Sequence, residues 1–206
     1  MLVKSEKTLN IEPIKAGMCR AVCSSVIDLG THINKFNPER SQRKVMLIWE
    51  TDTTYATEEG AIKPRSISKE VVLSLHEKAT LRKIIESWNS YKFSEEEAEK
   101  GIYLEEQIGK SCLLNISHSK KEDKIYASID SVTPLMEGLK PLKIIGGATY
   151  FSMDKGLDGF EKLPNYIQKK IEQTPEYRRL MGQTPSQNHG QSKGNLELVE
   201  DDDLPF

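Results

Sequence analysis

The chain has 206 residues, of which 37% are hydrophobic and 29% charged, as in an ordinary globular protein. At this length we expect one domain of about 150 residues with appendages. No apolar run approaches the ~20 residues of a membrane-spanning helix, and the charged start Met1–Lys7 lacks the apolar stretch of a secretory signal. These features exclude a membrane protein and predict a cytoplasmic one.

The formal net charge of −2 hides an uneven distribution. From Gln183 onward the chain has one lysine against five acids, so this part carries −4 and residues 1–182 carry +2. A body this weakly basic has no global field for a polyanion. Any nucleic-acid site must therefore come from local placement of Lys and Arg.

Three strand-like segments come first. Residues 17–29 alternate loosely between small and β-branched residues, and residues 43–51 are apolar on both faces in their middle. The second pattern predicts a strand that is buried on one side and covered or ligand-facing on the other. A polar loop is expected over residues 52–64, and a third strand over residues 65–75.

A helical region follows. Apolar residues recur mostly at three- and four-residue intervals from Leu75 to Trp88, which predicts a helix from Ser74 to about Asn89 with Trp88 in the core. A second, short helix is expected to begin at Ser94, which has capping-box spacing to Glu97, and to stop at Gly101.

Two further strands are expected over residues 111–118 and 124–132, joined by a hairpin loop. In the second strand, alternation places Ile125, Ala127 and Ile129 inward. The same alternation places Tyr126 on the outside.

Three strands, a helical segment and two strands are the element order of the five-stranded OB-fold barrel with an inserted helix. An SH3-like barrel or an unclosed α+β sandwich fits the same order. We expect a mainly β fold with its barrel domain over residues 1–150, where residues 140–150 are a further strand or a crossing loop. A helical extension over residues 151–182, split by Pro175, should pack on the barrel or on a second subunit, and residues 183–206 should be a flexible linker with an acidic tip.

The last six residues, Asp201, Asp202, Asp203, Leu204, Pro205 and Phe206, resemble the acidic tip of bacterial single-stranded DNA-binding proteins. Leu204 replaces the isoleucine before proline, and the other five positions match. The resemblance implies that Phe206 enters an apolar pocket on a partner while the aspartates face a basic rim. The expected partners are replication and recombination proteins such as a helicase, an exonuclease, a primase or a polymerase accessory protein. A merely solubilising acidic tail is the alternative.

The body resembles bacteriophage single-stranded DNA-binding proteins with an OB-fold. The matching segments are Val26 to Thr31, Val45 to Glu50 and Ser74 to Arg82, within residues 16–135. The resemblance implies a protein that coats single-stranded DNA without sequence preference in phage replication, recombination and repair, in the host cytoplasm.

Such binding needs cations along a groove and aromatic rings on which bases stack. Three basic and aromatic clusters fall on the strands and loops that an OB-fold uses for its ligand. They comprise Lys35, Phe36, Arg40, Arg43 and Lys44; Tyr55, Lys63, Arg65 and Lys69; and Lys120, Lys121, Lys124 and Tyr126. Trp49 is a further stacking candidate, with a place in the core as its alternative.

Catalysis has little support in the sequence. The four histidines lack a motif that pairs a nucleophile with a base, and Gly146-Gly147 lacks the Lys-Ser/Thr of a phosphate-binding loop. We expect no enzyme, no cofactor and no metal, and we expect the three cysteines to be thiols. A metal-dependent nuclease would have to draw on the strand acids Asp28, Glu50 and Asp130.

The leading alternative is an adaptor that displays the same tail to compete for host replication and repair proteins without binding DNA. The weak +2 charge of the body keeps this alternative open. The oligomeric state is also open, a homo-oligomer included.

Overall fold

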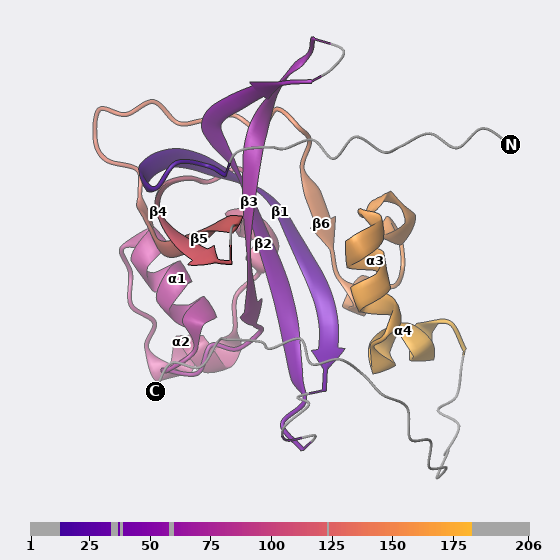
Figure 1. Cartoon of the computed structure of the whole chain (residues 1–206). Coiled ribbons are helices and arrows are strands. Elements are labelled where there is room, and N and C mark those ends of the chain that lie inside the picture. Colours follow the sequence, from indigo (N-terminus) through magenta and orange to yellow (C-terminus); the bar gives the residue numbers. More distant parts are fainter. Residues whose placement is uncertain (1–12, 34–36, 38, 58–59, 123, 183–206) are drawn as a thin grey trace, which may run out of the picture.

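The structure, a computed structural model, describes residues 13–33, 37, 39–57, 60–122 and 124–182. Its main element is a six-stranded sheet in which β3, β2, β1, β4 and β5 pair in that order, all antiparallel, while β6 pairs with β1 in parallel (Figure 1). The strands are β1 (Gly17–His32), β2 (Gln42–Ala56), β3 (Ile62–Val72), β4 (Ser111–Lys121), β5 (Lys124–Pro134) and β6 (Thr149–Phe151). The helices are α1 (Thr80–Asn89), α2 (Glu95–Lys100), α3 (Asn165–Glu172), α4 (Pro175–Leu180) and three 3-10 turns, η1 (Leu104–Gln107), η2 (Met153–Lys155) and η3 (Phe160–Lys162). The expected mainly β fold with short helices is confirmed.

The hairpin of β2 and β3 is longer than the sequence suggested. The loop expected over residues 52–64 is wrong for most of its length, because Tyr55 pairs with Lys63 and Ala56 pairs with Ile62. Threonine and tyrosine favour the extended backbone, so the two strands continue past an irregularity near Glu50. The result is a hairpin that projects beyond the body of the sheet (Figure 1).

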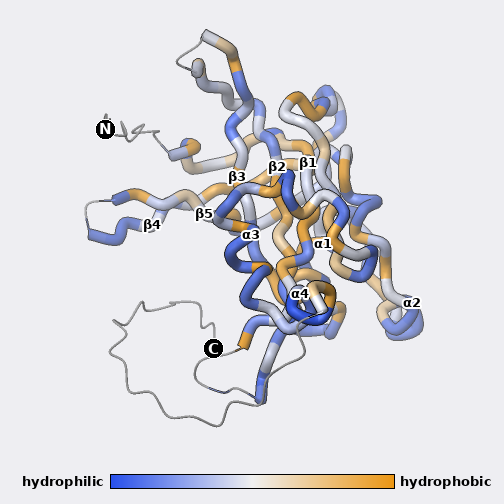
Figure 2. The backbone as a smooth tube through the Cα atoms, turned by 90° about the vertical axis from the view of Figure 1, so that its right-hand side faces the viewer, coloured by the Kyte–Doolittle hydropathy of each residue, from blue (hydrophilic) through white to orange (hydrophobic). Residues whose placement is uncertain are grey.

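The hairpin of β4 and β5 projects in the same way, and Figure 2 shows it extending away from the body. Its pairing continues to Lys121 and Lys124. Ile129 is buried and Tyr126 is 49% exposed, as expected, but Ile125 is 50% exposed. The inward position expected for Ile125 is therefore wrong, because this part of β5 extends past the core that would cover it.

The inner face of the curled sheet encloses the larger of two apolar cores, and α1 covers it. Leu81, Ile84, Ile85 and Trp88 of α1 are buried, which confirms the apolar stripe from Leu81 onward, but the helix begins at Thr80 and not near Ser74 as expected. Trp88 packs against Trp49 of β2 with ring centroids 5.9 Å apart. The capping box at Ser94 and the stop at Gly101 are also confirmed.

The sheet is not a closed barrel. In the described part of the chain no strand pairing joins β3 to β5, the two ends of the strand path. One side chain spans this seam, since Lys69 of β3 donates through Nζ to the carbonyl oxygen of Ile129 on β5 at 2.7 Å. None of the described helices is long and apolar enough to cross a membrane.

The C-terminal extension packs on the outer face of β1 and β2, so its packing on the sheet is confirmed. Here a second core joins Ile27 and Met46 of the strands to Phe160, Ile167 and Ile171 of the extension. Both faces of β1 and β2 are therefore covered, which explains why the middle of β2 is apolar on both faces. Figure 1 shows α3 and α4 beside the strands on the side opposite α1 and α2.

Gly30 lies where the extension approaches β1 most closely. Its φ is +76°, and a Cβ there would lie 2.7 Å from Met153 Cε and 2.8 Å from Thr174 Cβ. Both the backbone conformation and the contact therefore require glycine.

We expect Gly30→Ala to lower the free energy of unfolding by about 2–4 kcal/mol, from left-handed strain and overpacking together. Gly60→Ala is the matched control, because Gly60 has φ +80° and open space around its Cβ position. That change should cost only about 1–2 kcal/mol. Urea denaturation of both variants measures the difference, and equal losses would contradict the close contact.

Candidate nucleic-acid interface

A groove of about 680 Å³ lies on the outer face of β1, β2 and β3. Its floor is formed by strand residues, and three segments surround it: the tip of the β2–β3 hairpin, the loop before β6, and the turn between η3 and α3. The groove is lined by Ser24, Ser25, Ile27, Ile48, Glu50, Tyr55, Ala61, Ile62, Lys63, Pro64, Ser66, Ile145, Gly146, Gly147, Thr149, Lys162, Leu163 and Pro164.

The loop before β6 is held in place by Glu50. The carboxylate of this buried residue accepts hydrogen bonds from the backbone N–H groups of Ile145 at 2.7 Å and Gly146 at 2.8 Å. A Cβ on Gly146 would lie 2.7 Å from Glu50 Oε1, so glycine is what allows the approach. These donors compensate the burial of a charge and fix one wall of the groove.

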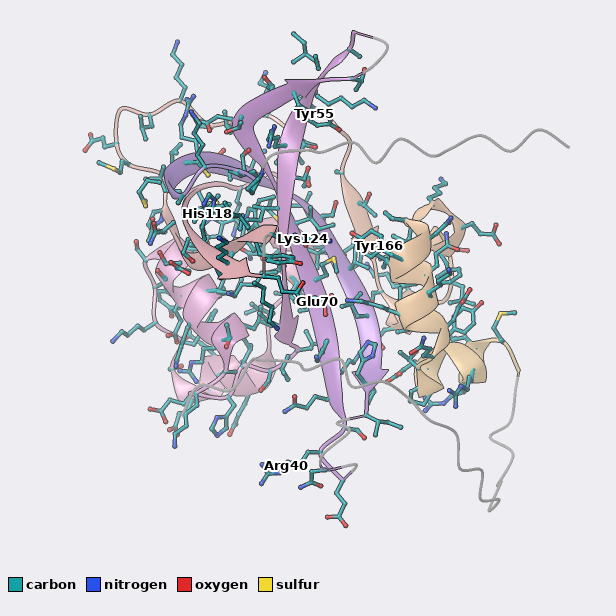
Figure 3. The ribbon with its side chains drawn as sticks, viewed as in Figure 1. Arg40, Tyr55, Glu70, His118, Lys124 and Tyr166 are labelled. Carbon is teal, nitrogen blue, oxygen red and sulfur yellow. The ribbon has the colours of Figure 1, made fainter. Side chains whose placement is uncertain are left out.

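The hairpin tip brings an aromatic ring, an aliphatic side chain and a cation to the groove. Tyr55 is half-buried on β2, and its register partner Lys63 on β3 is exposed. Ile62, beside Lys63, is 71% exposed. Figure 3 shows Tyr55 on this projecting hairpin. A half-buried ring and an exposed apolar side chain next to an ammonium group can contact a base and a phosphate together.

A second basic cluster lies on the β4–β5 hairpin. Lys120, Lys121, Lys124 and Tyr126 are all exposed on it. Lys121 stands opposite Lys124, and Tyr126 opposite Ser119. Like charges placed directly across a strand pair repel each other, so an anion bound here would relieve that repulsion.

Three predicted site residues have structural roles instead. Trp49 is 0% exposed, so the stacking role predicted for it is wrong and its core alternative holds. Lys69 spans the seam between β3 and β5. Arg43 donates through Nε to Asp28 at 3.1 Å and through Nη2 to Asp154 at 2.9 Å, so it ties β2 to β1 and to the extension rather than facing a ligand.

The remaining predicted residues are dispersed. Arg40 is exposed in the β1–β2 connection, at the end of the sheet opposite Tyr55 (Figure 3). Lys44 on β2 and Arg65 on β3 are half-buried. Lys35, Phe36 and the tip Asp201–Phe206 lie outside the described residues.

The groove also contains residues that the sequence did not single out. The sequence pattern places Ile62 in a loop, but its position next to the candidate Lys63 could have marked it as a site residue. Lys162 carries no local signal, because its position depends on the extension packing across β1 and β2.

The strand acids proposed for a metal-dependent alternative have other partners. Asp28 accepts from Arg43 and from the backbone N–H groups of Gly30 and Met153, and Asp130 accepts from Ser117 Oγ at 2.6 Å. In residues 13–182, where described, no group of three or more His, Cys, Asp or Glu is placed to hold a metal ion. Burial, with the charge of Asp52, raises the pKa of Cys19 to about 11, so this thiol stays protonated at neutral pH.

We expect Arg43→Gln to lower the free energy of unfolding by about 2–3 kcal/mol, because it leaves the buried Asp28 without its counter-charge. Arg40→Gln, at an exposed position, should change it by less than about 0.5 kcal/mol. Urea denaturation compares the two, and equal stabilities would refute the structural role of Arg43.

Comparison of the chain with protein-family models finds no model that matches, and comparison with curated proteins finds no match either. The function is therefore inferred from the groove, the basic hairpin and the order of the strands.

Proposed function

We propose that this protein binds and coats single-stranded DNA without sequence preference in phage replication and recombination, and that its C-terminal tip recruits partner proteins. The observation that carries the proposal is the groove over β2 and β3. In an OB-fold this face binds oligonucleotides, together with the β1–β2 and β4–β5 loops.

The strand order supports the OB-fold assignment. The path from β3 through β2, β1 and β4 to β5, with α1 between β3 and β4, is that of an OB-fold opened between β3 and β5. The OB-fold is described as partly open, and here Lys69 crosses the seam with one hydrogen bond to Ile129. We therefore propose an OB-fold in which backbone hydrogen bonds do not close the seam between β3 and β5.

The chemistry of the groove suits single strands. Tyr55 offers a face for base stacking, which contributes about 1–3 kcal/mol per base. Lys63 and Lys162 offer charge to phosphates. Binding through stacking and phosphate contacts alone is tolerant of sequence.

The basic hairpin adds a second contact region. Lys121 and Lys124 flank the β4–β5 turn, and Arg40 lies in the β1–β2 connection. These are the two loops that extend the ligand face of an OB-fold. We propose that both contact the backbone of the bound strand.

We expect the full chain to bind a fluorescein-labelled oligothymidine, with an affinity that falls steeply with salt because phosphate contacts release counterions. Fluorescence anisotropy is the measurement, because Trp49 and Trp88 are buried and their emission is a poor reporter. Tyr55→Ala should weaken binding about five-fold or more, and Lys63→Ala should reduce the log-log salt slope by about 0.7.

Lys83→Ala, an exposed lysine of α1 away from the groove, should bind like the wild type. Equal affinity for duplex and single-stranded DNA would contradict the proposal.

We expect removal of Phe206 to leave oligothymidine binding intact or slightly tighter while abolishing capture of host helicase or exonuclease partners, because the terminal ring and carboxylate are the proposed contact. Pull-down with the full-length and shortened chains measures capture. Unchanged capture would contradict the tip assignment, and capture without any DNA binding by the full chain would favour the adaptor. The pairing of body cations with acids, as in Arg20 with Asp52, is the observation that favours the adaptor.

A further inference from the structure

We infer that the side of α3 that carries Tyr166 and Lys170 belongs to the single-stranded DNA site. We also infer that Glu70 of β3 forms an ion pair with Lys170 when no DNA is bound, and so competes with the DNA for this lysine. The inference rests on the proposed function. It extends the site from the strands to the C-terminal extension, where the strand and loop residues predicted from the sequence do not reach.

Two lysines, one before α3 and one on it, reach the outer face of the strands. Lys162, in the turn just before α3, lines the groove together with Ile48 and Ser66 of the strands. Two turns further on, Lys170 Nζ contacts Glu70 Oε1 of β3. Lys162 therefore reaches the groove from the turn before α3, and Lys170 reaches β3 from the helix itself.

Tyr166 lies between the two lysines in the sequence. It precedes Lys170 by four residues, a spacing that stacks side chains one above the other on a helix. In the view of Figure 3, Tyr166 lies on the side of α3 that is turned toward the strands.

The exposure of Tyr166 is not explained by packing. The buried side of α3 is supplied by Ile167 and Ile171, both 0% exposed, whereas Tyr166 is 57% exposed. An exposed ring flanked by two lysines is the combination on which a base stacks while its phosphates meet charge. With Tyr55 at the hairpin end, the groove would have two stacking platforms.

Glu70 gives the site a competitor of its own. The side chains of Lys170 and Glu70 are 43% and 33% exposed, and ion pairs this exposed are held weakly. A carboxylate and a phosphate present similar oxygens to an ammonium group. A DNA phosphate at Lys170 would therefore displace Glu70, whose negative charge then opposes the bound strand.

The test uses the full chain and a labelled oligothymidine of about 16 nucleotides, the upper end of single OB-fold site sizes. We expect Tyr166→Ala to weaken binding about five-fold or more, and Tyr166→Phe to bind like the wild type because stacking needs the ring and not the hydroxyl. Tyr103→Ala is the matched control, since Tyr103 is 74% exposed next to η1.

The role of Glu70 is tested in the same assay at low salt. We expect Glu70→Gln to tighten binding at least about two-fold, and expect this gain to be smaller in a Lys170→Ala background, where only the repulsion between Glu70 and the bound strand is removed. Thermal melting shows whether each variant is folded.

Three outcomes decide the matter. If the wild type binds and Tyr166→Ala binds as tightly as Tyr103→Ala, the α3 side is not in the site and the inference is overturned, while the proposed function stands. If Glu70→Gln does not tighten binding, Glu70 is not a competitor. If the wild type does not bind single strands at all, the proposed function fails and the inference with it.

Discussion

The arrangement of the molecule depends on one buried carboxylate, that of Asp28 on β1. It accepts hydrogen bonds from the guanidinium group of Arg43 on β2 and from the backbone N–H of Met153, where the C-terminal extension begins. A buried charge is tolerated only with such partners, so sheet and extension are fixed to each other at this point. Thr31 adds a second tie, since its hydroxyl and N–H both donate to Glu176. From this anchor the extension continues over the outer core, which places α3 against β1, and Lys170 of α3 reaches Glu70 of β3.

Glu50 plays the corresponding part at the groove itself. Its hydrogen bonds to Ile145 and Gly146 fix the loop before β6, as those of Asp28 fix the start of η2. The groove is thus the part of the outer sheet face that the loop and the extension leave uncovered. In an OB-fold, residues outside the five strands would in this way decide which part of the ligand face stays open. The proposed function accordingly depends on two acids that do not touch the ligand.

Local patterns were enough to predict the elements and their order, because each depends on neighbours in sequence. The capping box of Ser94 and Glu97 and the apolar stripe of α1 are examples. Patterns could not separate Arg43 from Arg40, which are equally charged and three residues apart, because the difference lies in the register of β2 against β1, where the pairing shifts near Asp28. Trp49 posed a similar problem. A strand covered on both faces has no polar side to mark which of its residues point inward. Lys162 could not be predicted as a site residue from the sequence, because its place in the groove wall depends on tertiary packing.

The weak charge of the body is compatible with a basic site because many of its cations have acidic partners. Arg20, Arg43 and Lys155 pair with acids of other elements, which reduces the net charge without using the lysines of the groove wall and the β4–β5 hairpin. Lys170 pairs with Glu70 of β3 and belongs to the part of α3 that is proposed to extend the site. In the proposed complex a phosphate replaces this carboxylate, and the released Glu70 takes up a cation from solution. That uptake offsets part of the counterion release from the DNA, so the salt slope would understate the number of phosphates contacted. A steep slope from so weakly charged a body would then mean that the phosphates are bound mainly by Lys63, Lys162 and the hairpin lysines, whose contacts release counterions without such an exchange.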